Sequence, residues 1–349
     1  ADAVQSYARL LELAPEFKFA KGDLLHTKML CCDWTDLEAL RTSIGQDVVA
    51  RKPATAPFGF QGICDSEREL RTCAEVYAAE RYPPQTFDPH APRARRHARI
   101  RIGYLSSDFR QQATSLLMAE VFELHARDRF EIIAFDNGWD DGSDIRRRIK
   151  AAFDEIVDIT RMKDREAAAA VRSREIDVLV NLNGYFGDTR QGVFAHRPSP
   201  VQVNYLGFPG TLGAAYIDYL IADATVIPEA SRRHYCEKIA YLPDSYQAND
   251  RKRAIADRTF AREELGLPES GFVFCCFNNS YKITPTTFDG WMRILARVRG
   301  SVLWLLEDDP EAARNLRNEA AARGVAPERL VFAKRMPLAD HLARHRAAD

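Results

Sequence analysis

The sequence lacks the signatures of several large protein classes. No run approaches twenty apolar residues and no charged-then-apolar leader is present, so neither membrane insertion nor secretion is expected. Its 349 residues include 49 Lys and Arg against 50 Asp and Glu, a formal net charge of −1, which favours neither nucleic-acid nor membrane partners. Apolar residues are plentiful instead, at 46%, enough to fill the cores of two ordinary domains.

Paired cysteines and nucleotide-binding motifs are missing as well. The seven cysteines are odd in number and none lie in a C-x-x-C pair, so a disulfide framework or zinc site is not expected, and a reducing cytoplasm is the predicted location. No G-x-G-x-x-G follows Ile100–Leu105 and no G-K-[ST] occurs, which disfavours nicotinamide enzymes and P-loop phosphotransferases. The acids Glu307-Asp308-Asp309 are favoured as a helix cap over a metal site.

The first part of the chain has helical periodicity. Apolar residues recur at helical spacing in Ala3–Leu13 and again in Phe17–Leu30, which predicts two short antiparallel helices. Residues 1–50 are interpreted as the helical tail of a tetratricopeptide-like array, because one such helix pair cannot bury its own stacking face. Residues 51–98, rich in Pro, Ala and charges, are interpreted as a linker.

From residue 99 the pattern changes to alternating strands and helices, which predicts parallel α/β sheets. Residues 99–250 are expected to form an N-terminal Rossmann-like domain and 251–349 a C-terminal one. A complete parallel sheet usually has five or more strands, and the second series has only three, so the second domain is expected to be truncated. The predicted strands are Ile100–Leu105, Phe130–Phe135, Val178–Asn181, Val201–Tyr205, Tyr219–Ala222, Lys238–Leu242, Phe272–Phe277, Val302–Leu306 and Leu330–Phe332.

The predicted strand Phe272–Phe277 leads into a polar turn that carries Lys282. Its uninterrupted apolar run is typical of a strand buried on both faces of a parallel sheet. Ligands of open α/β sheets bind outside the carboxyl ends of strands, so the turn would present a cation where a phosphorylated ligand lies. A solvated loop without function is the alternative interpretation of the same residues.

Three further loops follow strands of the first series. Ser106–Phe109 and Asn181–Tyr185 are polar, and Gly207–Gly213 holds three glycines, which allow a ligand to approach the backbone closely. The three loops are expected at one edge of the first sheet, and they would face residues 278–282 across an interdomain cleft if the two sheets are arranged mouth to mouth.

Eight ordered motifs resemble the catalytic region of the O-linked N-acetylglucosamine transferase and SPINDLY family. The resemblance runs from about Arg99 to Asp349, and the repeat-like start fits the tetratricopeptide array of that family. The motifs are SSDF at Ser106–Phe109, DDG at Asp140–Gly142, NLNGY at Asn181–Tyr185, FAHRPSPVQVNYLGFPGTLG at Phe194–Gly213, DYLIAD at Asp218–Asp223, EKIAYLP at Glu237–Pro243, FNNSYK at Phe277–Lys282 and SVLWLL at Ser301–Leu306.

The resemblance implies a GT-B fold, in which two Rossmann-like domains hold a nucleotide-sugar donor. It implies an inverting, metal-independent transfer of a sugar, N-acetylglucosamine in first place, from a UDP-sugar to Ser or Thr hydroxyls of a protein or peptide acceptor. No cofactor besides the donor substrate is implied. The identity of the sugar and of the acceptor proteins stays open.

The resemblance also implies roles for particular residues. Lys282 would neutralise the diphosphate leaving group and is the implied catalytic residue. The implied donor-binding residues are Asn279, Tyr281, Leu206, Gly207 and Pro209. The implied acceptor and rim residues are Gln112, Thr114 and Arg190.

The chain departs from the family pattern in two places. Gln112 stands where the family has a histidine, and an amide cannot act as a general base. The family's His-Thr-Thr segment, whose helix N-terminus holds the diphosphate, would lie beyond Asp349, so the isolated chain is expected to transfer little or no sugar.

Two other classes of function stay open. One is a catalytically degenerate GT-B repeat protein that serves as a protein-binding module; a large gain of transfer on Gln112→His would favour it. The other is a nucleotide-sugar epimerase of the same fold, which would form product without an acceptor.

Overall fold

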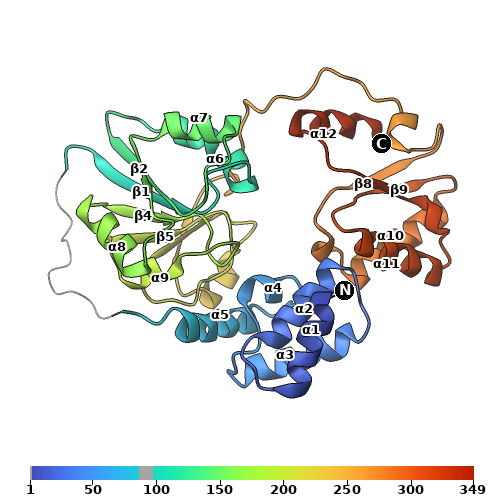
Figure 1. The fold of residues 1–349 in the computed structure, drawn as a ribbon, viewed down its shortest axis with the longest axis horizontal. Helices are drawn as coiled ribbons and strands as arrows, with labels where there is room; N and C mark the ends of the chain where they lie inside the picture. Colours follow the sequence, from blue (N-terminus) through green and yellow to red (C-terminus); the bar gives the residue numbers. More distant parts are fainter. Residues whose placement is uncertain (1, 86–96) are drawn as a thin grey trace. The chain divides into compact units, whose positions relative to one another are not determined.

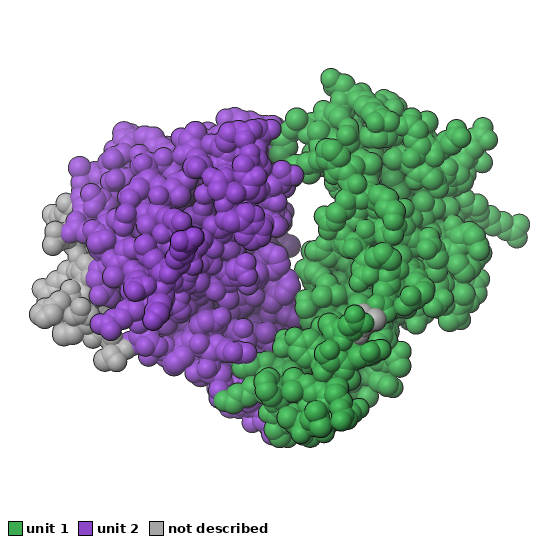
Figure 2. All heavy atoms as spheres, viewed as in Figure 1, with its two compact units in different colours: residues 1–46, 253–349 green, residues 47–252 purple. Residues whose placement is uncertain are grey.

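The computed structural model describes residues 2–85 and 97–349, which form two compact units (Figures 1 and 2). Unit 1 comprises residues 1–46 and 253–349, and unit 2 comprises residues 47–252. The helix α3 (Leu37–Val49) runs from one range into the other.

Unit 2 is built on a seven-stranded sheet in which every neighbouring pair is parallel. The strand order is β3-β2-β1-β4-β5-β6-β7, so the direction of chain progression reverses between β1 and β4. This order confirms the predicted Rossmann-like class. The strands are β1 (Ile100–Ser106), β2 (Phe130–Asp136), β3 (Glu155–Asp158), β4 (Val178–Asn181), β5 (Val201–Asn204), β6 (Tyr219–Ala222) and β7 (Lys238–Tyr241).

Helices cover both faces of this sheet (Figure 1). Tyr104 packs in the hydrophobic cluster with α6 (Ala113–Glu123) and α7 (Asp144–Ala152), whereas its neighbour Leu105 packs with α8 (Asp164–Ser173) and α9 (Gln191–Ala195). Successive strand residues thus point to opposite clusters, as a pleated strand requires. Burial on both faces explains why these strands have nearly continuous apolar sequences.

Part of the segment predicted as a linker is helical. It contains α4 (Pro57–Gln61) and α5 (Glu67–Arg81), and Ser66 caps α5, because its hydroxyl accepts a hydrogen bond from Glu69 N at 3.3 Å. The face that α5 buries carries mainly small residues, Ala74 among them, and it gives a weak hydrophobic signal for that reason. Residues 86–96 of the predicted linker lie outside the described residues.

Unit 1 contains a three-stranded parallel sheet in the order β10-β9-β8. Helices α10 and α11 lie on one face and α12 on the other (Figure 1). The bounds are β8 (Val273–Cys276), α10 (Pro285–Arg297), β9 (Val302–Leu306), α11 (Pro310–Ala322), β10 (Leu330–Ala333) and α12 (Leu338–Arg344).

The strand β8 differs from its prediction as a central strand buried on both faces. It is an edge strand among the described residues, and Phe274, Cys275 and Cys276 are only half-buried. An apolar groove of about 300 Å³ runs between these residues and α10, where Trp291 and Ile294 line it. An apolar run indicates that a strand is buried, but it does not indicate how many neighbours the strand has.

Helix α2 (Ala20–Leu30) and the residues after it pack on this C-terminal sheet unit, and α1 (Asp2–Leu13) packs against α2. Beyond α2, the Cys31 carbonyl accepts a hydrogen bond from Asn315 Nδ2 at 2.9 Å, and the Trp34 ring meets the Phe288 ring edge-on at 5.4 Å between centroids. The domain boundaries at residues 50, 98 and 250 and the tetratricopeptide assignment stay predictions.

Candidate active site

The loops after β1 and β4 meet at the carboxyl edge of the sheet in unit 2, where the strand order reverses. Asn183 joins them, because its Oδ1 accepts a hydrogen bond from Ser107 N at 3.0 Å and its Nδ2 donates to Ser107 Oγ at 3.0 Å. Ligands of open parallel sheets bind at this kind of reversal. The structure therefore brings two of the predicted loops together.

Asp108 is a buried carboxylate at this edge, and it was missing from the predicted site residues. It is 5% exposed, and burial raises the pKa of its carboxyl group although the Ser107 hydroxyl and the nearby Arg110 guanidinium favour the charged form. The Thr114 hydroxyl lies 3.5 Å from Asp108 Oδ2. A buried acid with a raised pKa at a strand end is a candidate for proton transfer. Its position directly after a buried strand was the available sequence signal.

Gln112 and Thr114 lie at the start of α6. Gln112 is the residue before the helix, has an extended backbone (φ −133°, ψ 161°) and forms no capping hydrogen bond through its side chain. The neighbouring Gln111 N donates to Asp141 Oδ2 at 2.8 Å, which holds the turn against the loop after β2. Thr114 is buried, and Gln112 is half-buried.

Arg190, predicted at the acceptor rim, binds other parts of unit 2 through each nitrogen of its guanidinium. Nε donates to Asp164 Oδ1 at 2.7 Å, Nη1 donates to Asn137 Oδ1 at 2.7 Å, and Nη2 donates to the Met162 carbonyl at 2.8 Å. These bonds connect α9 to the start of α8 and to the loop after β2. A role of Arg190 toward an acceptor stays a prediction.

The segment Leu206–Gly213, named the glycine loop from here on, follows β5. Leu206 has φ 70°, a left-handed conformation that costs a non-glycine residue about 1 kcal/mol. At Gly207 a Cβ atom would lie 2.2 Å from the Leu182 carbonyl oxygen, so only glycine fits there. Pro209 is half-buried, and Asn204 Nδ2 donates to the Phe208 carbonyl at 2.8 Å. The loop backbone therefore lies directly against the loop after β4.

The remaining predicted residues lie in unit 1, on the turn between β8 and α10. Tyr281 and Lys282 belong to a short 3₁₀ turn that Asn279 precedes. Burial raises the pKa of Tyr281, and a hydrogen bond from the Asn279 side chain partly offsets that effect. The Lys282 ammonium is exposed, lies 5.9 Å from the centroid of the Tyr281 ring, and forms no ion pair with a carboxylate within residues 2–85 and 97–349.

Helix α2 and Cys32, which follows it, contact this turn. The His26 ring of α2 lies 5.3 Å from the Tyr281 ring, and the Cys32 thiol donates to the Ser280 carbonyl at 3.6 Å. Thr284 then caps α10 by accepting a hydrogen bond from Thr287 N at 3.3 Å. The turn therefore places an unpaired cation beside a helix N-terminus, an arrangement that attracts anions.

The three acids after β9 are engaged by the protein itself. Asp309 Oδ1 accepts a hydrogen bond from Glu311 N at 2.8 Å and caps α11, Glu307 pairs with Lys334 at 2.6 Å, and Asp308 pairs with Arg335 at 2.5 Å. Among the described residues no three His, Cys, Asp or Glu side chains gather as a metal-binding group. The capping interpretation therefore holds for Asp309, whereas Glu307 and Asp308 form ion pairs instead.

Comparisons with known proteins identify the family. The description of glycosyl transferase family 41 matches residues 66–260 and 258–349. The chain belongs to glycosyl transferase family 41. This membership confirms the resemblance to O-linked N-acetylglucosamine transferases, and it extends over both sheets.

Named relatives of this family 41 chain come from plants and animals. A probable UDP-N-acetylglucosamine–peptide N-acetylglucosaminyltransferase, SEC of Arabidopsis thaliana, is 34% identical over 347 residues, which are 93% of this chain and 35% of the relative. A UDP-N-acetylglucosamine–peptide N-acetylglucosaminyltransferase of Caenorhabditis elegans is 25% identical and covers 92% of this chain and 39% of its own length. The chain thus spans little more than a third of these relatives.

A solved structure supports the fold that family 41 implies. A mutant of the O-GlcNAc transferase of Thermobaculum terrenum superposes with a TM-score of 0.79 at 27% identity and covers 98% of this chain and 65% of the other. The GT-B-like class predicted from the sequence is therefore confirmed. Across the described parts of the chain, no helix combines the length and the apolar character that crossing a bilayer takes.

Proposed function

We propose that the protein transfers a sugar, N-acetylglucosamine in first place, from a UDP-sugar to Ser or Thr hydroxyls of a protein acceptor. Family 41 membership and the names of its relatives support the reaction class. The observation that carries the proposal is Lys282, an exposed cation without an ion-pair partner among the described residues, at the carboxyl end of β8.

The proposed reaction is one inverting displacement. The acceptor oxygen forms a bond to the anomeric carbon while the bond from that carbon to the UDP oxygen breaks. Negative charge develops on the departing diphosphate, and the Lys282 ammonium stabilises it without a metal ion. Asn279 and Tyr281 lie on the same turn and bind the donor beside it.

The acceptor hydroxyl must lose a proton during the displacement. Gln112 cannot accept it, because an amide has no basic site near neutral pH. Asp108 is a buried carboxylate near the start of α6, and its raised pKa suits it better to proton transfer than an ordinary aspartate. We assign proton acceptance to Asp108, and acceptor contact to Gln112 and Thr114.

The proposed location of the protein is the cytoplasm, and its first helices are proposed to be the end of a tetratricopeptide-like array. All seven cysteines are free, which suits a reducing compartment. The helical character of α1 and α2 suits a repeat array that binds acceptor proteins.

The test compares Lys282→Ala with a matched control in the protein that carries the whole reading frame. Lys238 is the control, because it is also exposed and its ammonium lies 5.8 Å from the centroid of the Tyr219 ring. With radiolabelled UDP-N-acetylglucosamine we expect Lys282→Ala to lower kcat about a hundredfold or more, Lys282→Arg to retain part of it, and Lys238→Ala to leave it unchanged. Equal incorporation by wild type and Lys282→Ala would remove the catalytic role. No incorporation by the wild type would favour the binding-module alternative.

A further inference from the structure

Glu237, the residue immediately before β7, is a buried carboxylate that no role described above uses. It is 5% exposed, and its oxygens accept hydrogen bonds from the Thr211 hydroxyl at 2.7 Å and from Leu212 N at 2.8 Å. Among the described residues no Lys, Arg or His forms an ion pair with it. A buried carboxylate without a paired cation lowers stability compared with a neutral group. Its two partners both belong to the glycine loop.

The hydrogen bonds around Thr211 require an acceptor at position 237. The Thr211 hydroxyl oxygen already accepts from Gly213 N at 3.2 Å and from Cys236 N at 3.2 Å, so its single proton is directed at Glu237. Leu212 N is a donor as well. An ionised carboxylate presents an acceptor to each of these donors, whereas a glutamine would present its NH₂ group to one of them. The site is therefore built for the carboxylate and not merely for a polar side chain of that size.

Other groups fix the same end of the glycine loop. The Tyr185 hydroxyl donates to the Leu212 carbonyl at 2.6 Å. Gly213 has φ 63°, and a Cβ atom there would lie 2.4 Å from Ala74 C and Glu75 N, so the loop backbone packs directly on the backbone of α5.

Helix α5 also holds the segment that leads to Glu237. Its Glu67 pairs with His234 at 3.8 Å, and Arg71 Nη1 donates to the Arg233 carbonyl at 2.7 Å. His234 and Arg233 belong to the 3₁₀ turn η1 (Glu229–His234), three residues before Glu237. Helix α5 therefore fixes both Gly213 and the approach to Glu237.

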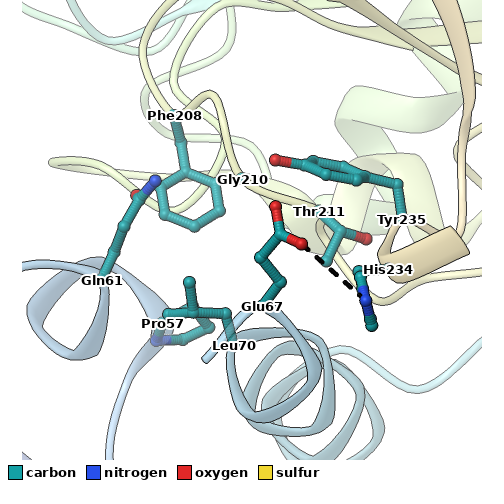
Figure 3. Close-up of a pocket in the computed structure, with 9 residues that line it drawn as sticks. All are labelled: Pro57, Gln61, Glu67, Leu70, Phe208, Gly210, Thr211, His234 and Tyr235. Carbon is teal, nitrogen blue, oxygen red and sulfur yellow. Dashed lines mark ion pairs between the residues drawn. The ribbon is translucent and has the colours of Figure 1, made fainter. Parts of the chain in front are cut away.

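The space beneath the glycine loop is nearly filled. Figure 3 shows Pro57 and Leu70, from α4 and α5, facing Phe208, Gly210 and Thr211, with His234 and Tyr235 at the side. The cavity between them is about 30 Å³, which is room for a single water molecule. The glycine loop has little room to move toward α4 and α5. A shift of Thr211 and Leu212 caused by a substitution at Glu237 therefore displaces the neighbouring backbone of the loop.

We propose that Glu237 is a positioning residue that holds the far end of the glycine loop, so that the backbone of Leu206 and Gly207 takes up the hexose of the donor. The inference rests on the proposed function. Thr211 is the residue through which Glu237 acts, and α5 is the support on the other side. Glu237 itself does not contact the donor.

The test uses Glu237→Gln, which preserves the shape of the side chain and replaces one acceptor by a donor. A 1 Å misplacement of a binding group can cost about a hundredfold in rate, so we expect kcat/KM for the UDP-sugar to fall about tenfold to a hundredfold. Thr211→Val should produce a similar loss, and the double variant should be little worse than either single one because both remove the same bond. Thr211→Ser keeps the hydroxyl and should stay within about twofold of wild type.

Asp223 provides the matched control in unit 2. It is 4% exposed, and its carboxylate accepts hydrogen bonds from Thr225 N at 2.9 Å, Val226 N at 2.8 Å and Tyr246 N at 2.7 Å, none of which belongs to the glycine loop. If Asp223→Asn lowers kcat/KM as much as Glu237→Gln does, the effect is general destabilisation and the proposal is wrong. Wild-type kinetics for Glu237→Gln would overturn it as well.

A second measurement keeps the inference separate from the proposed activity. Hydrogen exchange of the backbone amides of Leu206, Gly207, Phe208 and Gly210, none of which bonds to Glu237, reports the position of the near end of the loop. We expect faster exchange there in Glu237→Gln than in wild type, whether or not the wild type transfers sugar. Unchanged exchange at those amides would overturn the positioning role, whereas absent transfer by the wild type would overturn only the proposed function.

Discussion

At the scale of single residues, the carboxylates Asp108 and Glu237 share an unusual electrostatic state. Burial raises the pKa of each above its ordinary value, and the hydrogen bonds each accepts only partly offset that effect. Asp108 has the Arg110 guanidinium 3.7 Å away, whereas Glu237 has no cationic partner among the described residues. Raised acid pKa values of this origin collect at functional sites because chemistry and precise positioning offset their effect on stability.

The raised pKa of Glu237 predicts the sign of a pH effect on stability. Its folded pKa exceeds the unfolded value near 4.5, so the folded protein binds this proton more tightly, and the free energy of unfolding falls as pH rises from about 4.5 through the folded pKa. We expect urea midpoints of the wild type to fall across this window relative to those of Glu237→Gln, which cannot titrate. Parallel midpoint curves for the two proteins would contradict this account.

The titratable groups that face Glu237 do not interfere with the comparison of wild type and Glu237→Gln. The groups that face it are Tyr185, Tyr235, Cys236 and Arg71. Burial raises the pKa of both tyrosines above 10 and that of the thiol above 9, while hydrogen bonding to Glu75 raises the pKa of the arginine. None of the four changes charge between pH 4 and 8. A difference between wild type and Glu237→Gln in that range therefore reports Glu237 itself.

At the scale of elements, the sequence predicted most strands, but it did not predict the elements that lack an apolar run. The bounds of β4, β6 and β9 agree with those predicted, because a buried parallel strand has a continuous apolar sequence. The edge strand β3 was missed, since its burial is limited to one buried and one half-buried residue. Helix α5 was missed because it buries small residues.

The residues of the candidate site also fall into two groups, those that the sequence predicted and those that it did not. The positions of Lys282 after β8 and of the loops after β1 and β4 were predictable, because within each sheet the carboxyl ends of parallel strands lie at one edge. The roles of Asp108 and Glu237 were not, since each depends on contacts with residues far away in the sequence. Asp108 lies 75 positions from Asn183, and Glu237 lies 26 positions from Thr211.

The packing of the glycine loop on α5 makes a prediction about Gly213. Alanine there would have to adopt φ 63° and place its Cβ against the α5 backbone, so we expect Gly213→Ala to destabilise unit 2 by about 2–4 kcal/mol. Gly142→Ala is the control, because Gly142 has φ 65° and no atom lies within 4 Å of the place its new methyl group would occupy, so it should cost only about 1 kcal/mol. Chemical denaturation measures both, and equal losses would show that only the dihedral angle matters.

At the scale of the whole molecule, unit 1 is assembled from two stretches of chain, residues 1–46 and 253–349. Trp34 belongs to the first stretch and contacts Phe288 and Arg323 of the second, at 5.4 Å between ring centroids and 5.6 Å from the guanidinium carbon. The contacts of Trp34 therefore stabilise the C-terminal sheet unit from the opposite end of the chain.

This arrangement predicts a selective effect of Trp34→Ala. We expect a loss of about 3 kcal/mol in the unfolding of unit 1, with little change in unit 2. Trp291 and Trp304 report unit 1 by fluorescence, and Trp139 reports unit 2. Trp139→Ala, at a side chain that is 59% exposed, is the control for loss of a tryptophan. An equal shift of both units by Trp34→Ala would mean that they unfold as one.

The discontinuity of unit 1 also sets an order of events during synthesis. The Cys32 thiol and the Ser280 carbonyl are 248 positions apart, so α2 is synthesised long before the turn that it contacts. Unit 2 has all its residues once position 252 is made, and at about 5–20 residues per second the stretch from there to Ser280 takes roughly 1–6 s. During that delay the apolar residues of α2 lack these native partners, and transiently exposed apolar surface of this kind favours chaperone binding.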